Sequence, residues 1–337
     1  MTSTPGRRLA DFHLLDGSRF ELFENDDIAG KFTGDMRYFA GIIRRLAATE
    51  AGRDLRYHVT AWLDDRQVVG RDVVVLMIGD ERYQVPACTP DVLAVLKTGG
   101  LTPPALPELS LGSPRLWLLE SMRAARNRRD TSRRRRQFGL PVAPNNVFHL
   151  PLGYFLQVEQ PVVPPRDRPI DVCFAGGFFP SGGGRFSAGL RPRTFIRAQL
   201  TRVLHRWKPA GLRVELHPSR PGDPPLGPEA YSRLLADSKI ALCPRGNFPE
   251  TFRTIEAARA GCVLVRDVQP DAWYYRDLPG EPMPHWSRLP ALLERMLADP
   301  QQLQAQHESS LQWWRRVVSE DAVVGKIADW LAKLRKS

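Results

Sequence analysis

The chain has 337 residues, of which 42% are hydrophobic and 25% are charged. These proportions are those of folded globular proteins and exclude a disordered chain, and the length suits two domains that each bury a core. The formal net charge is +11, and only seven of the 48 basic residues are lysines. This charge favours anionic substrates or a membrane surface as partners, and it argues only weakly for nucleic acid.

The cysteines and the apolar runs bear on the location of the protein. The cysteines are widely spaced, lie mostly among apolar residues and include no Cys-x-x-Cys pair: Cys88, Cys173, Cys243 and Cys262. This pattern is typical of reduced core thiols and favours the cytoplasm. No apolar run approaches the length of about 18 residues that a membrane span needs, and the N-terminus lacks the apolar core of a secretion signal. We therefore expect a cytoplasmic protein, free or peripheral to the inner face of the membrane.

The first half of the chain alternates between strand-like and helix-like patterns. We expect a frayed arm over residues 1–10, strands over 20–23, 55–62 and 73–78, and helices over 36–48 and 91–97. A last strand of this half begins near Asn145, and a Pro-Leu-Gly turn follows it. The proline-rich segment 157–169 then has the composition of a hinge, so we place a domain boundary near Leu152.

Acidic side chains follow two of the predicted strands. Asp80 and Glu81 come directly after the strand 73–78, and Asp35 lies with Asp26 and Asp27 in the loop that precedes the first helix. Ligands bind outside the carboxyl ends of parallel strands, so these acids are candidates for the acceptor side of an active site. The alternative is that they only form turns and cap helices, as most acids in such loops do.

The most basic part of the chain is "RAARNRRDTSRRRR", residues 123–136, within the segment 116–136. Anionic lipid and nucleic acid could both bind a run of arginines, and the third interpretation is a solvated or mobile basic loop. No aromatic residue interleaves with the arginines, which argues against stacking on bases. Among the functional interpretations, lipid docking therefore ranks ahead of nucleic acid.

A second α/β pattern begins after the linker. We expect strands over 170–175 and 212–217, and helices over 194–207, 288–298, 301–318 and 321–336. The glycine-rich turn 176–184, which includes Gly177, could let a diphosphate approach the backbone or could be a surface loop. Arg193 at the start of the helix 194–207 and His217 at the end of the second strand could contact a donor molecule. Their alternatives are a surface charge and a structural histidine.

The chain is organised around residues 238–265, which have the pattern of a strand, a loop, a helix and a second strand. An apolar run over 240–243 ends at Pro244, Thr251 can cap the helix, and apolar residues resume at Val263. Prolines close strands, hydroxyl residues cap helices, and short apolar runs form buried strands. This order is the repeating unit of a parallel α/β sheet.

The polar residues of this unit indicate an anion site. Arg245 and Gly246 lie in the loop, while Arg253 and Glu256, three residues apart, share a face near the start of the helix. A helix N-terminus with a nearby glycine and two arginines favours a diphosphate, and a carboxylate one turn later could take the hydroxyls of a ribose. The alternative is that Arg253 and Glu256 form an ordinary ion pair on the helix surface.

The same stretch resembles the C-terminal motif of exostosin-like glycosyltransferases, in which a Pro-Arg-Gly turn precedes a Ser or Thr, an Arg, a Glu-Ala pair and an Ala-Gly-Cys strand entry. The matching residues are Pro244, Arg245, Gly246, Thr251, Arg253, Glu256, Ala257, Ala260, Gly261 and Cys262. The resemblance implies that Arg253 binds the donor diphosphate and that Glu256 binds its ribose. It is specific over 238–265 and patchy over the rest of 72–336, where no catalytic residue of the family can be matched.

The resemblance also implies a GT-B architecture, in which two Rossmann-like α/β domains face a cleft and a C-terminal helix crosses back to the first domain. The expected parts are an acceptor-binding domain over 1–152, a donor-binding domain over 153–318 and the returning helix over 319–337. The donor would be a UDP- or GDP-sugar, and the acceptor a hydroxyl of a glycan, a lipid-linked molecule or a small molecule.

The implied reaction inverts the anomeric centre, and it needs one general base and a cationic clamp for the leaving diphosphate. Asp80, Glu81 and Asp35 are the candidate bases, in that order. The sequence has no Asp-x-Asp, so it requires no metal and no cofactor. The alternative function is a non-catalytic or nucleic-acid-binding protein that uses the basic segment 123–136.

Overall fold

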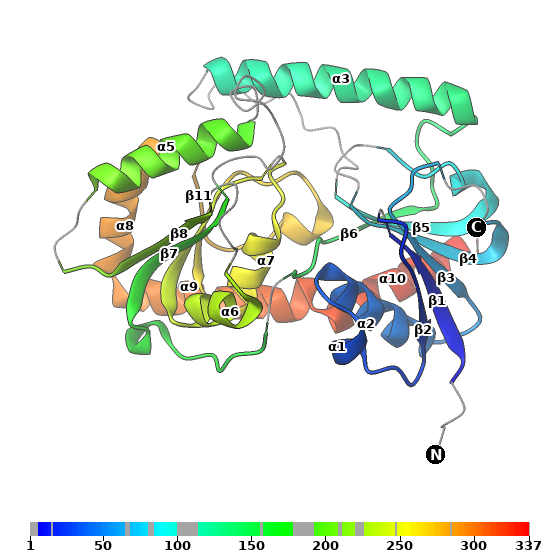
Figure 1. Ribbon diagram of the computed structural model, residues 1–337, viewed down its shortest axis with the longest axis horizontal. Helices are drawn as coiled ribbons and strands as arrows, with labels where there is room; N and C mark the ends of the chain where they lie inside the picture. The colour runs from blue at the N-terminus through cyan, green and yellow to red at the C-terminus, as the bar shows by residue number, and fades with distance from the viewer. Residues whose placement is uncertain are drawn as a thin grey trace. The chain divides into compact units, whose positions relative to one another are not determined.

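The structure of the protein is a computed structural model (Figure 1). It describes residues 6–14, 16–64, 68–79, 84–99, 114–155, 158–177, 192–207, 211–219, 226–246, 248–283 and 285–336. The chain divides into two compact units. Unit 1 comprises residues 1–103, 125–153 and 317–337, and unit 2 comprises residues 104–124 and 154–316. Each unit contains its own sheet, which confirms the prediction of an α/β protein with two domains.

Unit 1 is built on a six-stranded sheet in the order β2-β1-β3-β4-β5-β6. The strands are β1 (Arg8–His13), β2 (Arg19–Phe23), β3 (Arg56–Thr60), β4 (Gly70–Met77), β5 (Val92–Thr98) and β6 (Val147–Leu150). β1 and β2 form an antiparallel hairpin at one edge, and the remaining described pairings are parallel. The carboxyl ends of β3 to β6 therefore meet at one edge of the sheet.

Two sequence predictions for unit 1 are wrong. Residues 8–10 belong to β1 rather than to a frayed arm, because Leu9 and Ala10 are buried in the core, so the strand over 20–23 is the second one. The helix predicted over 91–97 is β5, whose Val95 and Leu96 are fully buried. A short continuous apolar run suits a buried strand and a buried helix alike, so its periodicity could not separate the two.

The helices of unit 1 include the last helix of the chain. α1 (Ile28–Lys31) precedes α2 (Asp35–Ala47), and α10 (Glu320–Leu334) packs against α2. The hydroxyl of Tyr38 in α2 donates to the carbonyl of Val318 at 2.6 Å. The ring of Trp330 in α10 lies 5.1 Å from that of Phe148 in β6, measured between centroids. The end of the chain thus completes the core of unit 1.

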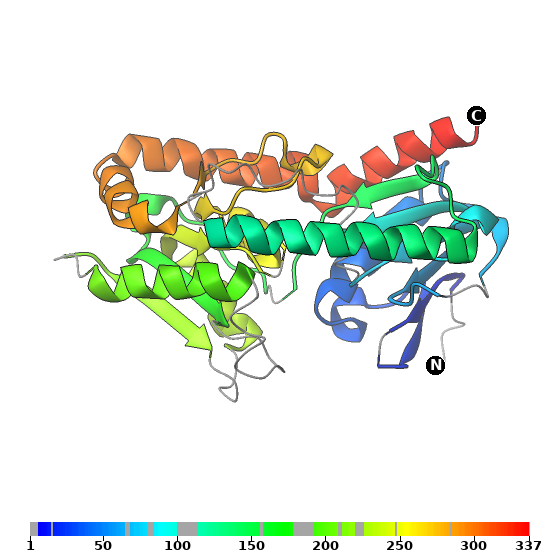
Figure 2. The ribbon, with the colours of Figure 1, turned by 90° about the horizontal axis from the view of Figure 1, so that it is seen from above.

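α3 (Pro114–Phe138) is one continuous helix that carries the basic segment (Figures 1 and 2). The interpretation of this segment as a basic loop is therefore wrong. Arginine is a good helix former, and no proline or glycine interrupts residues 115–138. The hydrophobic periodicity that usually identifies a helix is hidden here because so few positions are apolar.

Unit 2 contains a five-stranded sheet in the order β11-β10-β9-β7-β8, in which all pairings are parallel. Its strands are β7 (Ile170–Gly177), β8 (Val214–Ser219), β9 (Ser238–Cys243), β10 (Val263–Arg266) and β11 (Glu281–Pro282). Its α-helices are α5 (Pro192–Arg206), α6 (Pro228–Ala236), α7 (Phe252–Arg259), α8 (Leu289–Leu297) and α9 (Pro300–Trp313), and a π-helical turn follows at Trp314–Val318. The sequence prediction missed α6, and it extended the last-but-one helix through the π turn.

One face of the sheet in unit 2 packs on α5 and α8 through a core that includes Phe174, Leu242 and Trp286. All four cysteines of the chain are buried and none forms a disulfide, as the sequence predicted. Burial raises the pKa of Cys243 to about 12, so this thiol stays protonated at neutral pH. No helix in the described ranges has the length and apolar character that a membrane crossing needs.

A buried arginine ties the linker to the sheet of unit 2. Arg168 is 2% exposed. Its Nε donates to the carbonyl of Val163 at 2.9 Å, while its two terminal nitrogens donate to the carbonyls of Ser238 at 2.7 Å and Ala260 at 2.8 Å. One side chain therefore satisfies carbonyl groups from the linker, from the start of β9 and from the end of α7.

Candidate functional site

The candidate site lies at the carboxyl edge of the sheet in unit 2, where β7, β9 and β10 end. The predicted strand, loop, helix and strand are present as β9, the loop 244–251, α7 and β10. Thr251 is the N-cap of α7 and has extended backbone angles, but its hydroxyl makes no capping hydrogen bond. The hydroxyl oxygen lies 3.3 Å from that of Thr254 instead. The amides of the first turn of α7 thus have no side-chain cap from Thr251.

The guanidinium of Arg253 lies next to Gly176, in a space that a side chain at position 176 would fill. Its guanidinium carbon lies 5.0 Å from the centre of the Phe174 ring in β7. Gly176 has a φ of +149°, and a Cβ atom at this position would lie 2.2 Å from Nη2 of Arg253. A side chain at position 176 would therefore be strained and would also displace the guanidinium.

The charge of Arg253 has no anionic partner in the described part of the chain. Its Nε is buried and has no hydrogen-bond partner there, and no ion pair to its guanidinium is formed among the described residues. Burying a charged donor without a partner is costly, so such groups usually mark a place where a ligand or water completes the structure. Arg253 is therefore a donor that is held in position by packing and available to an anion.

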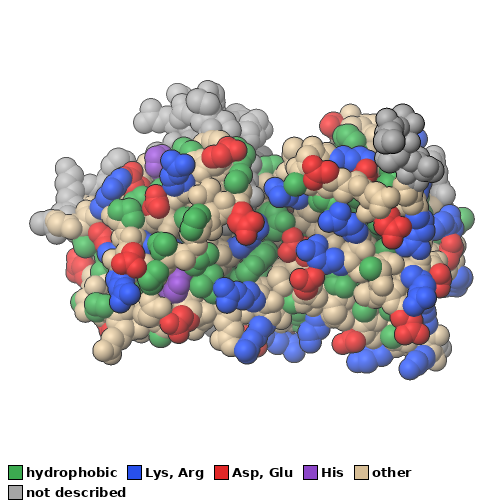
Figure 3. Space-filling model, turned by 90° about the horizontal axis from the view of Figure 1, so that it is seen from below, with side chains coloured by type: hydrophobic (Ala, Val, Ile, Leu, Met, Phe, Trp, Pro, Cys, Tyr) green, Lys and Arg blue, Asp and Glu red, His purple; other side chains and the backbone are tan. Residues whose placement is uncertain are grey.

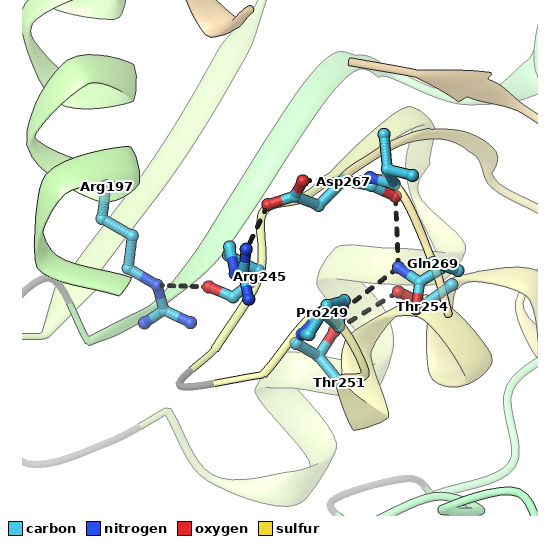
Figure 4. Close-up of polar contacts among 8 residues, drawn as sticks. Arg197, Arg245, Pro249, Thr251, Thr254, Asp267 and Gln269 are labelled. Carbon is cyan, nitrogen blue, oxygen red and sulfur yellow. Dashed lines mark hydrogen bonds and ion pairs between the residues drawn. The ribbon is translucent and has the colours of Figure 1, made fainter. Parts of the chain in front are cut away.

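Two further buried arginines lie beside this loop (Figure 4). Arg245 is 7% exposed and Arg197 is 4% exposed. Nε of Arg197, in α5, donates to the carbonyl of Arg245 at 3.3 Å, and Nε of Arg245 lies 3.9 Å from Oδ2 of Asp267. The loop thus carries a buried positive charge, and Asp267 is an acid beside it. Arg197 was missed by the sequence prediction, although it lies one helical turn after Arg193 and hence on the same side of α5.

Gln269 is a second residue that the sequence did not single out. Its Nε2 donates to the carbonyls of Pro249 and Asp267, both at 3.2 Å, which fixes the orientation of the amide (Figure 4). Its Oε1 is buried and accepts no hydrogen bond from the described residues. Gln269 therefore links the loop before α7 to the segment after β10. Its Oε1 remains an acceptor that no described residue uses.

Glu256 is buried in α7, so the interpretation of Arg253 and Glu256 as an ordinary ion pair on the helix surface is wrong. The residue is 3% exposed. Oε1 accepts the backbone N–H of Phe155 at 2.8 Å, and Oε2 accepts the hydroxyl of Tyr231 at 2.8 Å. Burial and the neighbouring Glu256 carboxylate together raise the pKa of Tyr231 well above its usual value. Glu256 therefore lies in the interior of unit 2, where it is bound to a backbone amide and to the hydroxyl of Tyr231.

The other predicted donor residues have less constrained positions. Gly246 has ordinary backbone angles, and a Cβ atom there would make only van der Waals contacts, the nearest at 3.6 Å to Thr251. The chain itself thus does not require glycine at this position. Gly177 is the last residue of β7, and Arg193 lies in the first turn of α5 with its side chain outside the described residues. His217, in β8, lies 3.7 Å from the carboxylate of Glu215.

The acidic candidates divide into three groups. Asp80 and Glu81 lie outside the described residues. Asp26 and Asp27 have the turn and capping roles of the alternative interpretation, because Asp26 accepts from Phe23 N–H at 2.7 Å and Asp27 caps α1 through Ala29 N–H. Asp35 is the first residue of α2, and its burial raises the pKa of its carboxyl above the usual value.

No protein-family model and no curated protein matches the sequence. Among solved structures, the chain is similar to a sucrose-phosphate synthase from Thermosynechococcus elongatus, with 14% identity, coverage of 90% of this chain and 79% of that chain, and a TM-score of 0.43. It is similar to AviGT4, a glycosyltransferase involved in avilamycin A biosynthesis, with 14% identity, coverage of 91% of each chain and a TM-score of 0.42. The GtfA/B complex matches with 11% identity over 80% of this chain and a TM-score of 0.43, and the chain spans 59% of the length of that protein. At TM-scores this low, these similarities carry no argument about activity.

Proposed function

We propose that the protein is a glycosyltransferase of GT-B type, of the exostosin-like kind, which moves a sugar from a UDP- or GDP-sugar to an acceptor hydroxyl. The observation that carries this proposal is Arg253, whose guanidinium lies against Phe174 and Gly176 and whose buried Nε has no hydrogen-bond partner among the described residues. An arginine fork matches the oxygens of a diphosphate in a way that a flexible lysine does not.

The donor diphosphate would bind between Arg253 and Arg245, beside the first turn of α7. The uncapped amides of that turn and the positive end of the helix favour the same anion. Gly246 and Gly177 would let the phosphates approach the backbone, and Thr251 would add a hydroxyl donor. Arg193 and His217 are the outer members of this proposed donor site.

Glu256 would hold the ribose hydroxyls. A carboxylate oxygen can accept more than one hydrogen bond, so contacts with protein groups such as Tyr231 and Phe155 do not by themselves prevent binding of a hydroxyl. The internal contacts would keep the carboxylate in one orientation before the nucleotide arrives. We assign donor binding to residues 153–318, acceptor binding to residues 1–152, and the last helix, over 319–337, to the first domain.

The proposed reaction is a single displacement with inversion. The acceptor oxygen attacks the anomeric carbon, the bond from that carbon to the diphosphate oxygen breaks, and a carboxylate takes the acceptor proton. Asp80, Glu81 and Asp35 are the proposed bases, and the raised pKa of Asp35 brings it closer to the value that suits a base at neutral pH. The diphosphate leaves with its charge stabilised by Arg253 and Arg245 rather than by a metal.

Thermal unfolding in the presence of nucleotides tests the proposal. With EDTA present, we expect UDP or GDP to raise the Tm of the purified protein, because ligand at about 100 times its Kd adds roughly 2.7 kcal/mol to the free energy of unfolding. The matched controls are the corresponding nucleoside monophosphates, which lack the second phosphate. An identical Tm with every nucleotide would contradict the proposal, and stabilisation that returns only with Mg²⁺ or Mn²⁺ would contradict metal independence.

A pair of substitutions separates the two roles of Glu256. We expect Glu256→Gln to weaken UDP or GDP binding and also to lower the free energy of unfolding by about 1–2 kcal/mol, because charge-assisted hydrogen bonds to Tyr231 and Phe155 become neutral ones. Tyr231→Phe removes one internal donor but keeps the carboxylate, so it should lower stability while nucleotide affinity changes little. Calorimetric titration and urea unfolding measure the two effects. Equal affinity losses in both variants would show that Glu256 has only a structural role.

A further inference from the structure

α3 carries an exposed row of side chains along most of its length. Its members follow one another at spacings of three or four residues and are all exposed: Leu118, Met122, Ala125, Arg129, Ser132 and Arg136. Residues at this spacing lie on one face of a helix. Leu118 and Met122 are 52% and 61% exposed. The exposed Arg126 and Arg133 border the same row.

The opposite face of α3 is turned toward the protein. Leu119, Ala124 and Asn127 are buried there. The guanidinium of Arg134 pairs with the carboxylate of Asp64 and donates to the carbonyl of Leu63 at 2.9 Å. One arginine of the segment thus forms an ion pair and a hydrogen bond with other residues of unit 1.

The arginines in the exposed row and at its border do not make such contacts. Among the described residues, the side chains of Arg129, Arg133 and Arg136 form no hydrogen bond or ion pair, and that of the neighbouring Arg126 makes only a 4.0 Å contact with Asp130. The face of the molecule in Figure 3 instead alternates acidic and basic side chains. A concentrated row of one sign repels itself, so it is expected where an oppositely charged partner compensates it.

We propose that the exposed row of α3 binds the surface of an anionic lipid bilayer. Arg126, Arg129, Arg133 and Arg136 would contact phosphate groups, and the long apolar side chains of Leu118 and Met122 would enter the boundary between headgroups and acyl chains. Arginines attract the phosphates of anionic lipids, and exposed leucine and methionine side chains on the same helix can enter the apolar boundary of a bilayer. This binding does not depend on the glycosyl transfer proposed above.

RNA is the competing partner for a basic surface, and the composition of the row argues against it. Single-stranded nucleic acid is held by aromatic side chains on which bases stack, in addition to a basic groove. The exposed row contains no aromatic residue. Its apolar members, a leucine and a methionine, suit acyl chains rather than bases.

Co-sedimentation of the full-length protein with vesicles tests the proposal. We expect binding to phosphatidylcholine vesicles that contain about 30% phosphatidylglycerol and none to pure phosphatidylcholine, with the binding lost as salt rises from about 0.05 M to 0.5 M. Each arginine at a bilayer surface contributes about fivefold in the partition coefficient, so the triple variant Arg129→Ser, Arg133→Ser, Arg136→Ser should bind about a hundredfold more weakly.

The control variant removes the same charge elsewhere. Arg56, Arg166 and Arg276 have side chains that are 67%, 84% and 71% exposed, outside α3 and outside the candidate site. Their joint replacement by serine should leave most of the vesicle binding intact, and circular dichroism should confirm that both variants are folded. Equal losses in the two variants, no binding by the parent protein at low salt, or tighter binding of an RNA oligonucleotide than of anionic vesicles would each overturn the proposal.

Discussion

Replacing Arg253 with alanine should lower both nucleotide affinity and turnover by at least tenfold. A charge-assisted hydrogen bond to a phosphate contributes about 1.5–3 kcal/mol, and about 1.4 kcal/mol already corresponds to a factor of ten. The effect on turnover should exceed the effect on affinity, because negative charge increases on the diphosphate as it leaves. Calorimetric titration of UDP and GDP gives the first quantity, and the rate of donor consumption gives the second.

Two further variants test whether nucleotide affinity depends on the position of the Arg253 guanidinium or only on the positive charge of the unit. Arg233→Ala removes an exposed arginine from α6 in the same unit and should leave nucleotide affinity unchanged. Gly176→Ala leaves Arg253 chemically intact but puts a Cβ atom 2.2 Å from its present Nη2 position, so it should lower affinity by displacing the guanidinium. Folded Arg253→Ala protein that binds nucleotide as well as the parent would refute the proposed diphosphate site.

The second large effect is expected on stability. Arg168→Ala should lower the free energy of unfolding of unit 2 by about 3 kcal/mol or more. The substitution leaves the carbonyls of Ser238 and Ala260 buried without their donor, and each unsatisfied buried group costs about 1–3 kcal/mol. Urea unfolding followed by tryptophan fluorescence provides the measurement, since Trp286 lies in the core of this unit.

The control for this prediction lies two residues away. The side chain of Arg166 is 84% exposed, and its contact with Asp167 is 3.7 Å long. Because exposed ion pairs contribute about 0–1 kcal/mol, Arg166→Ala should change stability very little. If both variants unfold at the same urea concentration, the hydrogen bonds of Arg168 do not hold the linker to the sheet.

The parts of the fold that the sequence predicted are those with strong local patterns. β9, α7 and β10 were predicted because an apolar run, a proline-bounded loop and a helical spacing follow one another directly. β5 was misassigned because its apolar run has no distinct period, and α3 was missed as a helix because arginine-rich helices carry almost no hydrophobic pattern. In both cases the deciding information is the tertiary surroundings, which a single sequence does not contain.

The same limit applies to the candidate site. Arg245 and Arg253 could be selected because they belong to one local motif. Arg197 and Gln269 reach the loop from α5 and from the segment after β10, so only the fold brings them there. Residues three apart on a helix differ by about 60° in direction. Because of this angle, Arg253 contacts Phe174 whereas Glu256 contacts Tyr231. The three-residue spacing alone does not predict that the two side chains have different neighbours.

The position of α10 in unit 1 affects how the protein folds during its synthesis on the ribosome. Synthesis proceeds from the N-terminus, and most domains fold in that order. Here the strands of unit 1 are made before the sheet of unit 2, but α10, which packs against α2 and contacts Phe148 through Trp330, is made after the whole of unit 2. Unit 2 therefore has all of its residues available before unit 1 does. Until α10 is made, α2 lacks the helix that packs against it, so part of its apolar surface stays uncovered during most of elongation.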